Sequence, residues 1–284
     1  MPSLPRSMKE YFVGTDDFQR AHELTDGGKT CQAARISANP LRGRKAPPSV
    51  GRWMLDSGAF TQISRFGDFT MSPKDYVELA VRFQDCGDLA CIVTQDYMCE
   101  PFVIHQLKLM GKEASWRLHQ RKTVDRYLQI MEEAEKQGLK VPVMPVLQGW
   151  EVEDYMEHWE LYANNTPIGA WARPSPFQPE QHKWLGLGST CKRNKKPAVV
   201  SLILDTLPWE YLNEWGFKIH AFGLKTTALK HGSIKDRLYS ADSFAYDYHA
   251  RMTGSCRTRR ERINSATAWG RKIREDDVQM DMDF

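Results

Sequence analysis

Three aspartates end short apolar runs in this sequence of 284 residues. Asp56 ends the run that starts at Arg52 and precedes a serine and a glycine, while Asp96 and Asp242 end two later runs. Parallel strands of α/β proteins carry their chemistry at their carboxyl ends, so we expect the three carboxylates to meet at one mouth. Carboxylates that lie so close together raise one another's pKa. Holding them together costs free energy, so such a group is expected to have a function. Asp-Ser-Gly is also ordinary turn chemistry, and Asp56 alone could equally be a turn residue.

Polar or small residues end other runs too, and an amide or a glycine backbone suits hydrogen bonding to the edge of a flat ligand. These residues are Ser57 after Asp56, Gln148 and Gly149 after the fifth run, and Gly188 and Ser189 after the sixth. His220 lies within the seventh run, where a histidine is more often a satisfied interior residue than a catalyst, so it stays outside the predicted catalytic set. Phe60, Tyr97 and Trp150 are near enough in sequence to sandwich a flat base, although such aromatics are equally common in cores.

The elements that would position these residues alternate between strand-like runs and helical patterns, which is typical of βα units around a parallel sheet. Eight runs are present, at residues 10–14, 32–37, 52–56, 88–96, 141–147, 184–188, 218–223 and 237–241. Helices are expected at residues 17–24, 73–83, 113–136, 151–162, 198–215 and 226–235. The pattern predicts an α/β fold, a (β/α)8 TIM barrel whose active site lies at the carboxyl ends of its strands.

The length fits one large barrel or two smaller domains, and we expect a single domain over residues 1–284. Within it, residues 251–284 are expected to form a basic helical C-terminal extension. Residues 164–183 are rich in Pro, Gly and Asn and are expected to be a long connection, in which 170–172 could form a short extra strand. The start of the chain lacks the apolar region of a signal peptide, and no apolar run approaches the roughly 18 residues of a membrane span. We therefore expect a cytosolic protein that has no membrane partner.

Charge is nearly balanced, with Lys and Arg totalling 39, Asp and Glu 36, and a formal net charge of +3. Any affinity for nucleic acid must therefore come from local clusters. One cluster consists of Lys192, Arg193, Lys195 and Lys196, and the other is the arginine-rich segment 251–274. Either run alone is more often a solvated face. Both together, one of them beside the predicted mouth, favour phosphate binding.

The six cysteines, at positions 31, 86, 91, 99, 191 and 256, are scattered. They form no C-x-x-C pair and no Cys/His set with the spacing of a zinc site. We therefore expect reduced thiols, no bound metal and no structural zinc subdomain.

The order and sequence of these segments resemble the tRNA-guanine transglycosylase superfamily over about residues 50 to 250. Leu55-Asp-Ser-Gly-Ala-Phe60 is similar to that family's D-S-G-G-F, Gln95–Cys99 sits where the family has F-D-E-C, and Val146–Gly149 resembles V-Q-G-G. Leu185–Gly188 is similar to the G-G-L region, His220–Gly223 to M-G-V-G, and Ala241–Phe244 to F-D-C-V. Residues 186–193 and 240–246 are more similar to the phage and bacterial DNA-modifying branch, the DpdA type. The family's zinc ligands, a C-x-C-x-x-C set with a later histidine, are missing here, which speaks against the usual tRNA docking.

The resemblance implies a pentosyltransferase that exchanges guanine in DNA for a 7-deazaguanine base of the preQ0 type, without breaking the backbone. Asp242 would be the nucleophile that forms a covalent glycosyl-enzyme, and Asp56 the general acid/base. The base would be bound by Ser57, Asp96, Gln148, Gly149 and Gly188, and the nucleic-acid backbone by Lys192, Arg193, Lys195 and Lys196. No cofactor is implied, and the partners would be DNA and the free base.

Two alternatives remain open from the sequence. The same chemistry could act on tRNA, as in queuosine-type or archaeosine-type modification. The chain could also be a non-catalytic nucleic-acid-binding paralogue, but such a protein would be expected to lose its nucleophile, and both Asp56 and Asp242 are present. If the protein is phage-encoded, its compartment would be the host cytoplasm.

Overall fold

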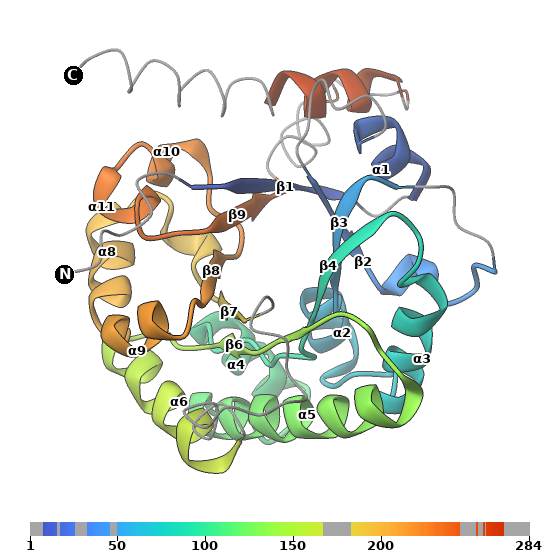
Figure 1. The fold of residues 1–284 in the computed structure, drawn as a ribbon. Helices are drawn as coiled ribbons and strands as arrows, with labels where there is room; N and C mark the ends of the chain where they lie inside the picture. Colours follow the sequence, from blue (N-terminus) through green and yellow to red (C-terminus); the bar gives the residue numbers. More distant parts are fainter. Residues whose placement is uncertain are drawn as a thin grey trace.

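The computed structural model describes residues 8–15, 18–25, 33–45, 50–166, 183–244, 254, 258 and 260–269. Nine parallel strands lie in the order β5-β4-β3-β2-β1-β9-β8-β7-β6, with helices around them (Figure 1). The strands are β1 (Glu10–Thr15), β2 (Ala33–Ser37), β3 (Arg52–Asp56), β4 (Asp88–Val93), β5 (Val143–Met144), β6 (Val146–Leu147), β7 (Trp184–Leu187), β8 (Lys218–Ala221) and β9 (Ser240–Ser243). They form a nearly closed barrel, which confirms the predicted α/β TIM-like fold.

The fifth predicted run forms two short strands instead of one, so the sheet has nine strands and not eight. β5 pairs with β4, β6 pairs with β7, and Pro145 lies between them. Proline has no backbone N–H and cannot donate to a ladder, so it divides the run. The interruption lies where the two ends of the nine-strand order meet.

The last strand begins later than predicted. Residues 237 and 238 still make turn-like hydrogen bonds to the carbonyls of Ile234 and Lys235, and regular pairing starts only at Ser240. Asp242, expected just after the strand, therefore lies within β9, where it is paired with Phe12 of β1.

The helices fall into two groups by position. In Figure 1 the outer ring is formed by α1 (Phe18–Thr25), α3 (Pro73–Phe83), α5 (Trp116–Gln137), α6 (Val152–Asn165), α8 (Pro197–Asp205), α9 (Trp209–Glu214), α10 (Thr226–Leu229) and α11 (Gly232–Lys235). α2 (Ala59–Phe66) and α4 (Pro101–Leu109), which were not predicted, are drawn inside that ring. Two predicted helices are each split in the structure: residues 198–215 form α8 and α9, and residues 226–235 form α10 and α11. The structure also has two short 3-10 helices, η1 (Asn39–Leu41) and η2 (Cys191–Arg193).

Capping chemistry sets the ends of the long helices. The Ser72 hydroxyl accepts a hydrogen bond from the N–H of Asp75 at 3.1 Å, which starts α3. In the same way, Ser115 accepts from Leu118 at 3.2 Å and starts α5, which ends at Gly138 with φ of 70°. These signals explain why both helices lie close to their predicted ranges.

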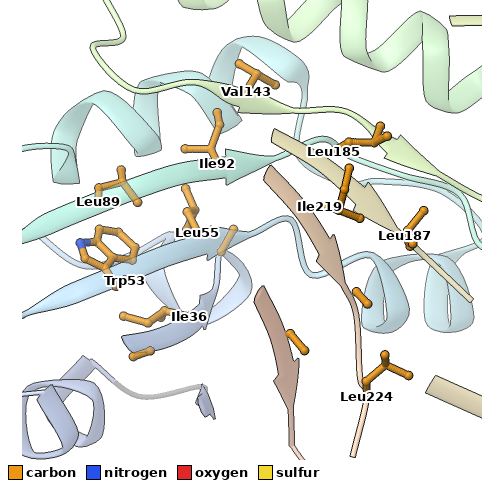
Figure 2. Packing of buried hydrophobic residues seen from close by; sticks show 14 of the residues in the cluster. Ile36, Trp53, Leu55, Leu89, Ile92, Val143, Leu185, Leu187, Ile219 and Leu224 are labelled. Carbon is orange, nitrogen blue, oxygen red and sulfur yellow. The ribbon is translucent and has the colours of Figure 1, made fainter. Parts of the chain in front are cut away.

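Buried apolar side chains form two layers because residues alternate between the two faces of each strand. The outer layer packs the strands against the helices, and Figure 2 shows part of it, including Trp53, Leu55 and Ile219. The inner layer fills the barrel and consists of Phe12, Ala33, Met54, Ala90, Cys91, Val93, Met144, Val146 and Trp184. The middle of the barrel interior is thus apolar.

Several predictions fall mostly outside the described residues. The connection at 164–183 is described only at its two ends, and residues 170–172 are not described at all. Within the predicted extension, residues 260–269 are helical, and Trp269 donates from its ring nitrogen to the hydroxyl of Tyr11 at 3.4 Å. No helix among the described ranges is both long enough and apolar enough to span a membrane. Cys86, Cys91, Cys99 and Cys191 form no disulfide, while Cys31 and Cys256 lie outside the described residues.

Candidate active site

Charged residues occupy the part of the barrel interior nearest the carboxyl ends of the strands. Arg35 lies two residues beyond Ala33, and Asp56 two beyond Met54, so each shares the inward face of its strand. Asp242 on β9 is also buried, with a side chain that is 0% exposed. The alternation that fills the barrel with apolar groups therefore ends in a charged layer.

Arg35 connects the two carboxylates that were predicted to be catalytic. Its Nη1 lies 3.0 Å from Oδ1 of Asp56, and its Nε lies 2.7 Å from Oδ2 of Asp242. Burial by itself would lower the pKa of Arg35, but the two carboxylates outweigh burial and raise it. The guanidinium therefore stays charged between the two acids.

The second oxygen of Asp242 is held by two further groups. Oδ1 accepts a hydrogen bond from the N–H of Gly223 at 2.9 Å and lies 3.3 Å from Nε2 of His220. The other ring nitrogen of His220 is 2.8 Å from the hydroxyl of Ser240. Although burial favours the neutral acid, Arg35 and then these contacts lower the pKa of Asp242 below its usual value. Asp242 is therefore an ionised carboxylate in a buried, fixed position.

Asp56 sits closer to solvent than Asp242, with 18% of its side chain exposed. Its Oδ2 accepts a hydrogen bond from the N–H of Gly58 at 3.2 Å. Gly58 has φ of 76°, and a Cβ there would come within 2.2 Å of the amide of Asn39, so only glycine fits this turn. The predicted sharp turn after the strand thus presents Asp56 at the rim of the buried site.

A row of hydrogen-bonded polar side chains runs past the ends of four strands, β3, β4, β6 and β7. Ser57 Oγ donates to Oδ1 of Asp96 at 3.3 Å, the amide nitrogen of Gln148 donates to Oδ2 of Asp96, and Ser189 Oγ donates to the amide oxygen of Gln148 at 2.7 Å. Burial, followed by the negative charge of Asp56, raises the pKa of Asp96 to about 7, although the bonds from Gln148 and Ser57 act in the opposite direction. Asp96 therefore titrates near neutral pH.

The turn that carries Gln148 and Gly149 is held by hydrogen bonds with buried side chains of neighbouring helices. Burial lowers the pKa of His158 to about 3, so its ring is neutral and its Nδ1 accepts from the N–H of Gln148 at 2.8 Å. Gln120 donates to the carbonyl of Gln148 at 2.7 Å. A Cβ on Gly188 would lie 2.2 Å from the Gln148 amide, and one on Gly149 would lie 2.8 Å from Asp154, so neither position has room for a side chain. The amide is thus held in a single orientation.

Glu100 and Arg193 extend this row on the side of Ser189. Glu100 is buried, which raises the pKa of its carboxyl, while Ser189 and the positive charges of Lys192 and Arg193 act against this rise. The guanidinium of Arg193 lies 4.3 Å from the ring centre of Trp150, and its buried Nε and Nη2 have no hydrogen-bond partner. A buried cation whose donors are unused is suited to receive an acceptor from a ligand.

The predicted backbone contacts divide into exposed and buried groups. Lys192, Lys195 and Lys196 are exposed in and after η2, which follows the carboxyl end of β7, whereas Arg193 is buried against Trp150. This places three exposed lysines beside the mouth.

The three aromatic residues considered for stacking have different surroundings. Phe60 is exposed, whereas Tyr97 is buried and donates its hydroxyl to Asp68 at 2.5 Å. Trp150 is stacked against Arg193. Phe60 alone of the three presents most of its ring to solvent, at 58% exposure.

The sequence prediction missed Arg35 and Glu100, and it left out His220. Arg35 interrupts the weakest predicted run, and its signal was a single charge at an inward position. Glu100 follows Asp96 by four residues and lies beyond the run predicted at residues 88–96. His220 is interior, as expected, but it also contacts Asp242.

Metal binding has no support among the residues described, where no group of three His, Cys, Asp or Glu side chains could hold an ion. The C-terminal region, where the zinc ligands of the tRNA enzymes would lie, is largely outside those residues, so the expectation of no zinc stays a prediction.

The chain is similar to a known protein family. The model described as DpdA, DeoxyPurine in DNA protein A, matches residues 34–282. No curated protein matches the chain.

Proposed function

The chain belongs to the DpdA family, DeoxyPurine in DNA protein A, and from this premise we propose that it exchanges guanine in DNA for a 7-deazaguanine base through a glycosyl-enzyme on Asp242. The observation that carries the proposal is the bridge from Asp56 through Arg35 to Asp242, beside the row that contains Asp96 and Gln148. Two carboxylates with different surroundings are the arrangement that a nucleophile and an acid/base require.

In the first half of the exchange, a carboxylate oxygen of Asp242 attacks C1′ of the target nucleotide while the C1′–N9 bond breaks. The departing guanine takes a proton from Asp56. The lowered pKa of Asp242 keeps the nucleophile ionised, and Arg35 orients it. Because Asp242 has no exposed surface, the sugar can reach it only after a neighbouring group moves.

In the second half, the incoming 7-deazaguanine loses its N9 proton to Asp56, and N9 attacks C1′ and releases Asp242. The proton given to guanine is thereby returned, and the sugar keeps its configuration after two displacements. The position of Asp56 at the rim, with Arg35 on one side and the Gly58 N–H on the other, supports its role in moving a proton to and from the base.

The base would be recognised by the row of polar side chains that contains Asp96 and Gln148, with successive positions on the base facing successive residues of the row. Around a 7-deazaguanine, the N1 and amine edge, O6 and C7 follow one another. Asp96 would accept from the N1 and amine edge, and Gln148, with the backbone at Gly149 or Gly188, would donate to O6. The 7-substituent would then lie against Glu100 and Arg193, where the unused donors of Arg193 favour an acceptor such as the nitrile of a preQ0-type base.

DNA would be held at the same mouth by phosphate contacts. Lys192, Lys195 and Lys196 are exposed there, and the buried Arg193 adds positive charge behind them. Such contacts are independent of sequence and weaken with salt.

The experiment that tests this function supplies labelled 7-deazaguanine base together with either duplex DNA or total tRNA. We expect label in DNA, the release of one guanine for each base inserted, and no strand cleavage. Label in tRNA alone would establish the tRNA alternative. Binding of DNA with no label in either polymer would establish the non-catalytic alternative.

A further inference from the structure

Exposed apolar side chains of the described residues gather on α2 and α4. Of the seven large hydrophobic residues that are exposed, five lie on these helices or directly after α4, namely Phe60, Phe66, Phe102, Leu109 and Met110. Single exposed hydrophobic residues are ordinary, whereas a cluster of this kind marks a surface that contacts another molecule.

Two of these residues stand at the mouth of the candidate site. Phe60 is in the first turn of α2, four residues after Asp56, and is 58% exposed. Phe102 is in the first turn of α4, two residues after Glu100, and is 44% exposed. α2 begins three residues after β3 ends and α4 eight residues after β4 ends, so both helices follow the carboxyl ends of strands, and Figure 1 draws them inside the ring of outer helices.

The fixed charges within the two helices are positive. The sequences of α2 and α4 contain no Asp or Glu, and their charged residues are Arg65 and Lys108. The ammonium group of Lys192 lies 5.5 Å from the ring centre of Phe102. Interleaved aromatic and basic side chains complement a nucleic acid, which offers stacked bases beside phosphates.

The two helices form a firm platform. A small core beneath them contains Ile63 of α2 with Val103 and Leu107 of α4. The amide of Gln106 also donates to the carbonyl of Ser64 at 3.4 Å, so α2 and α4 are joined directly. Phe60 and Phe102 are therefore held on an ordered surface.

We infer that Phe60 and Phe102 form an aromatic wedge that enters the base stack of duplex DNA and fills the place left by the extruded nucleotide. The inference rests on the proposed function, because attack on C1′ requires the target base to leave the stack at a cost of a few kcal/mol. Apolar side chains inserted between base steps are a known means of offsetting such a cost. Lys192, beside the ring of Phe102, would hold a flanking phosphate.

The test compares exchange on duplex DNA with exchange on single-stranded DNA of the same sequence, for wild type and for Phe60→Ala, Phe102→Ala and the double variant. The wedge predicts that the ratio of duplex to single-strand exchange falls by about tenfold or more in the double variant, because unpaired DNA needs no wedge. The matched control is Phe66→Ala, which removes the same kind of exposed ring about 9 Å further along α2. Its ratio should equal that of wild type.

Three results would overturn the wedge. An unchanged ratio in the double variant means that the rings do not help to open the duplex. An equal loss on both forms of DNA means that they stack on the base itself. A loss of self-association or of binding to another protein, with the ratio unchanged, would make the surface a protein-docking face. If wild type exchanges base on neither form of DNA, the proposed function fails. If it exchanges base on duplex DNA alone, a double variant that keeps the wild-type duplex rate overturns the wedge.

Discussion

Asp56 and Asp242 share one counter-ion, the guanidinium of Arg35, although they lie on strands at opposite ends of the chain. The shared cation removes the repulsion that two neighbouring carboxylates would otherwise have. The two carboxylates still differ in their surroundings. Asp242 is buried and has a lowered pKa, whereas Asp56 is partly exposed at the rim. Arg35 is thus a positioning residue for both groups.

Replacing Arg35 by methionine should destabilise the protein by about 3–5 kcal/mol at neutral pH, because it leaves the buried carboxylate of Asp242 without its cation. A folded-state pKa that is lowered contributes stability above the unfolded pKa and loses it as pH falls through the folded value. The difference in melting temperature between wild type and Arg35→Met should therefore be largest near pH 7 and shrink in acid. Melting curves at several pH values measure this.

Arg35→Lys is the matched control. Lysine keeps the positive charge, but its single ammonium nitrogen cannot replace the two guanidinium nitrogens that contact the two carboxylates. It should retain more stability than Arg35→Met and still lose exchange activity. A difference between wild type and Arg35→Met that does not depend on pH would show that Arg35 does not govern the ionisation of Asp242.

Asp96→Asn should weaken binding of the free base by roughly 10- to 150-fold, which corresponds to the removal of a charged hydrogen bond of about 1.5–3 kcal/mol. In wild type, base binding should weaken as pH falls below about 7, where Asp96 takes up a proton. Calorimetry with the free base across this range measures both effects.

The same substitution has the opposite effect on folding. The pKa of Asp96 is raised in the folded state, so the native protein holds a proton that the unfolded chain has released, and stability falls as pH rises from about 4 to about 7. Asp96→Asn lacks this cost and should gain stability relative to wild type between pH 5 and pH 8. No relative gain would contradict a buried carboxyl at this position.

The three exposed lysines in and after η2 should control the salt dependence of DNA binding. Replacing Lys192, Lys195 and Lys196 by alanine should weaken binding to DNA and flatten the plot of log affinity against log salt by about one unit for each phosphate that is no longer neutralised. Binding of the free base should not change. Lys136→Ala, which removes an exposed lysine on α5 that pairs with Glu132, is the control. Equal slopes for the triple variant and wild type would show that these lysines do not contact DNA.

The sequence predicted which polar residues meet at the mouth better than it predicted the ion pairs and hydrogen bonds that hold them there. Asp56, Asp96 and Gln148 follow clear strand patterns, and parallel strands bring their carboxyl ends to one mouth. Arg35 escaped prediction because its strand is short and weakly patterned, and only its pairing with β1 and β3 fixes its inward direction. The balance of charges around Asp242 depends on contacts between distant strands, which no local pattern encodes.

The helices at the mouth were missed for a different reason. α2 and α4 are short, α2 begins directly after the Asp-Ser-Gly turn at residues 56–58, and no helix was predicted in the segment that holds α4. Their stability comes from the small core they share, which includes Ile63 and Leu107, and that packing is a tertiary property. The split at Pro145, by contrast, follows from the missing N–H and was available from the sequence.

The most direct test of the account is to trap the intermediate. Wild-type protein is mixed with guanine-containing DNA without free 7-deazaguanine, denatured rapidly, and analysed by intact mass and peptide mapping. We expect a covalent protein–DNA adduct on the peptide that contains Asp242, and none from Asp242→Asn whose melting behaviour confirms that it is folded. An adduct on another residue, or base exchange by wild type and Asp242→Asn at equal rates, would contradict the assignment of Asp242 as the nucleophile.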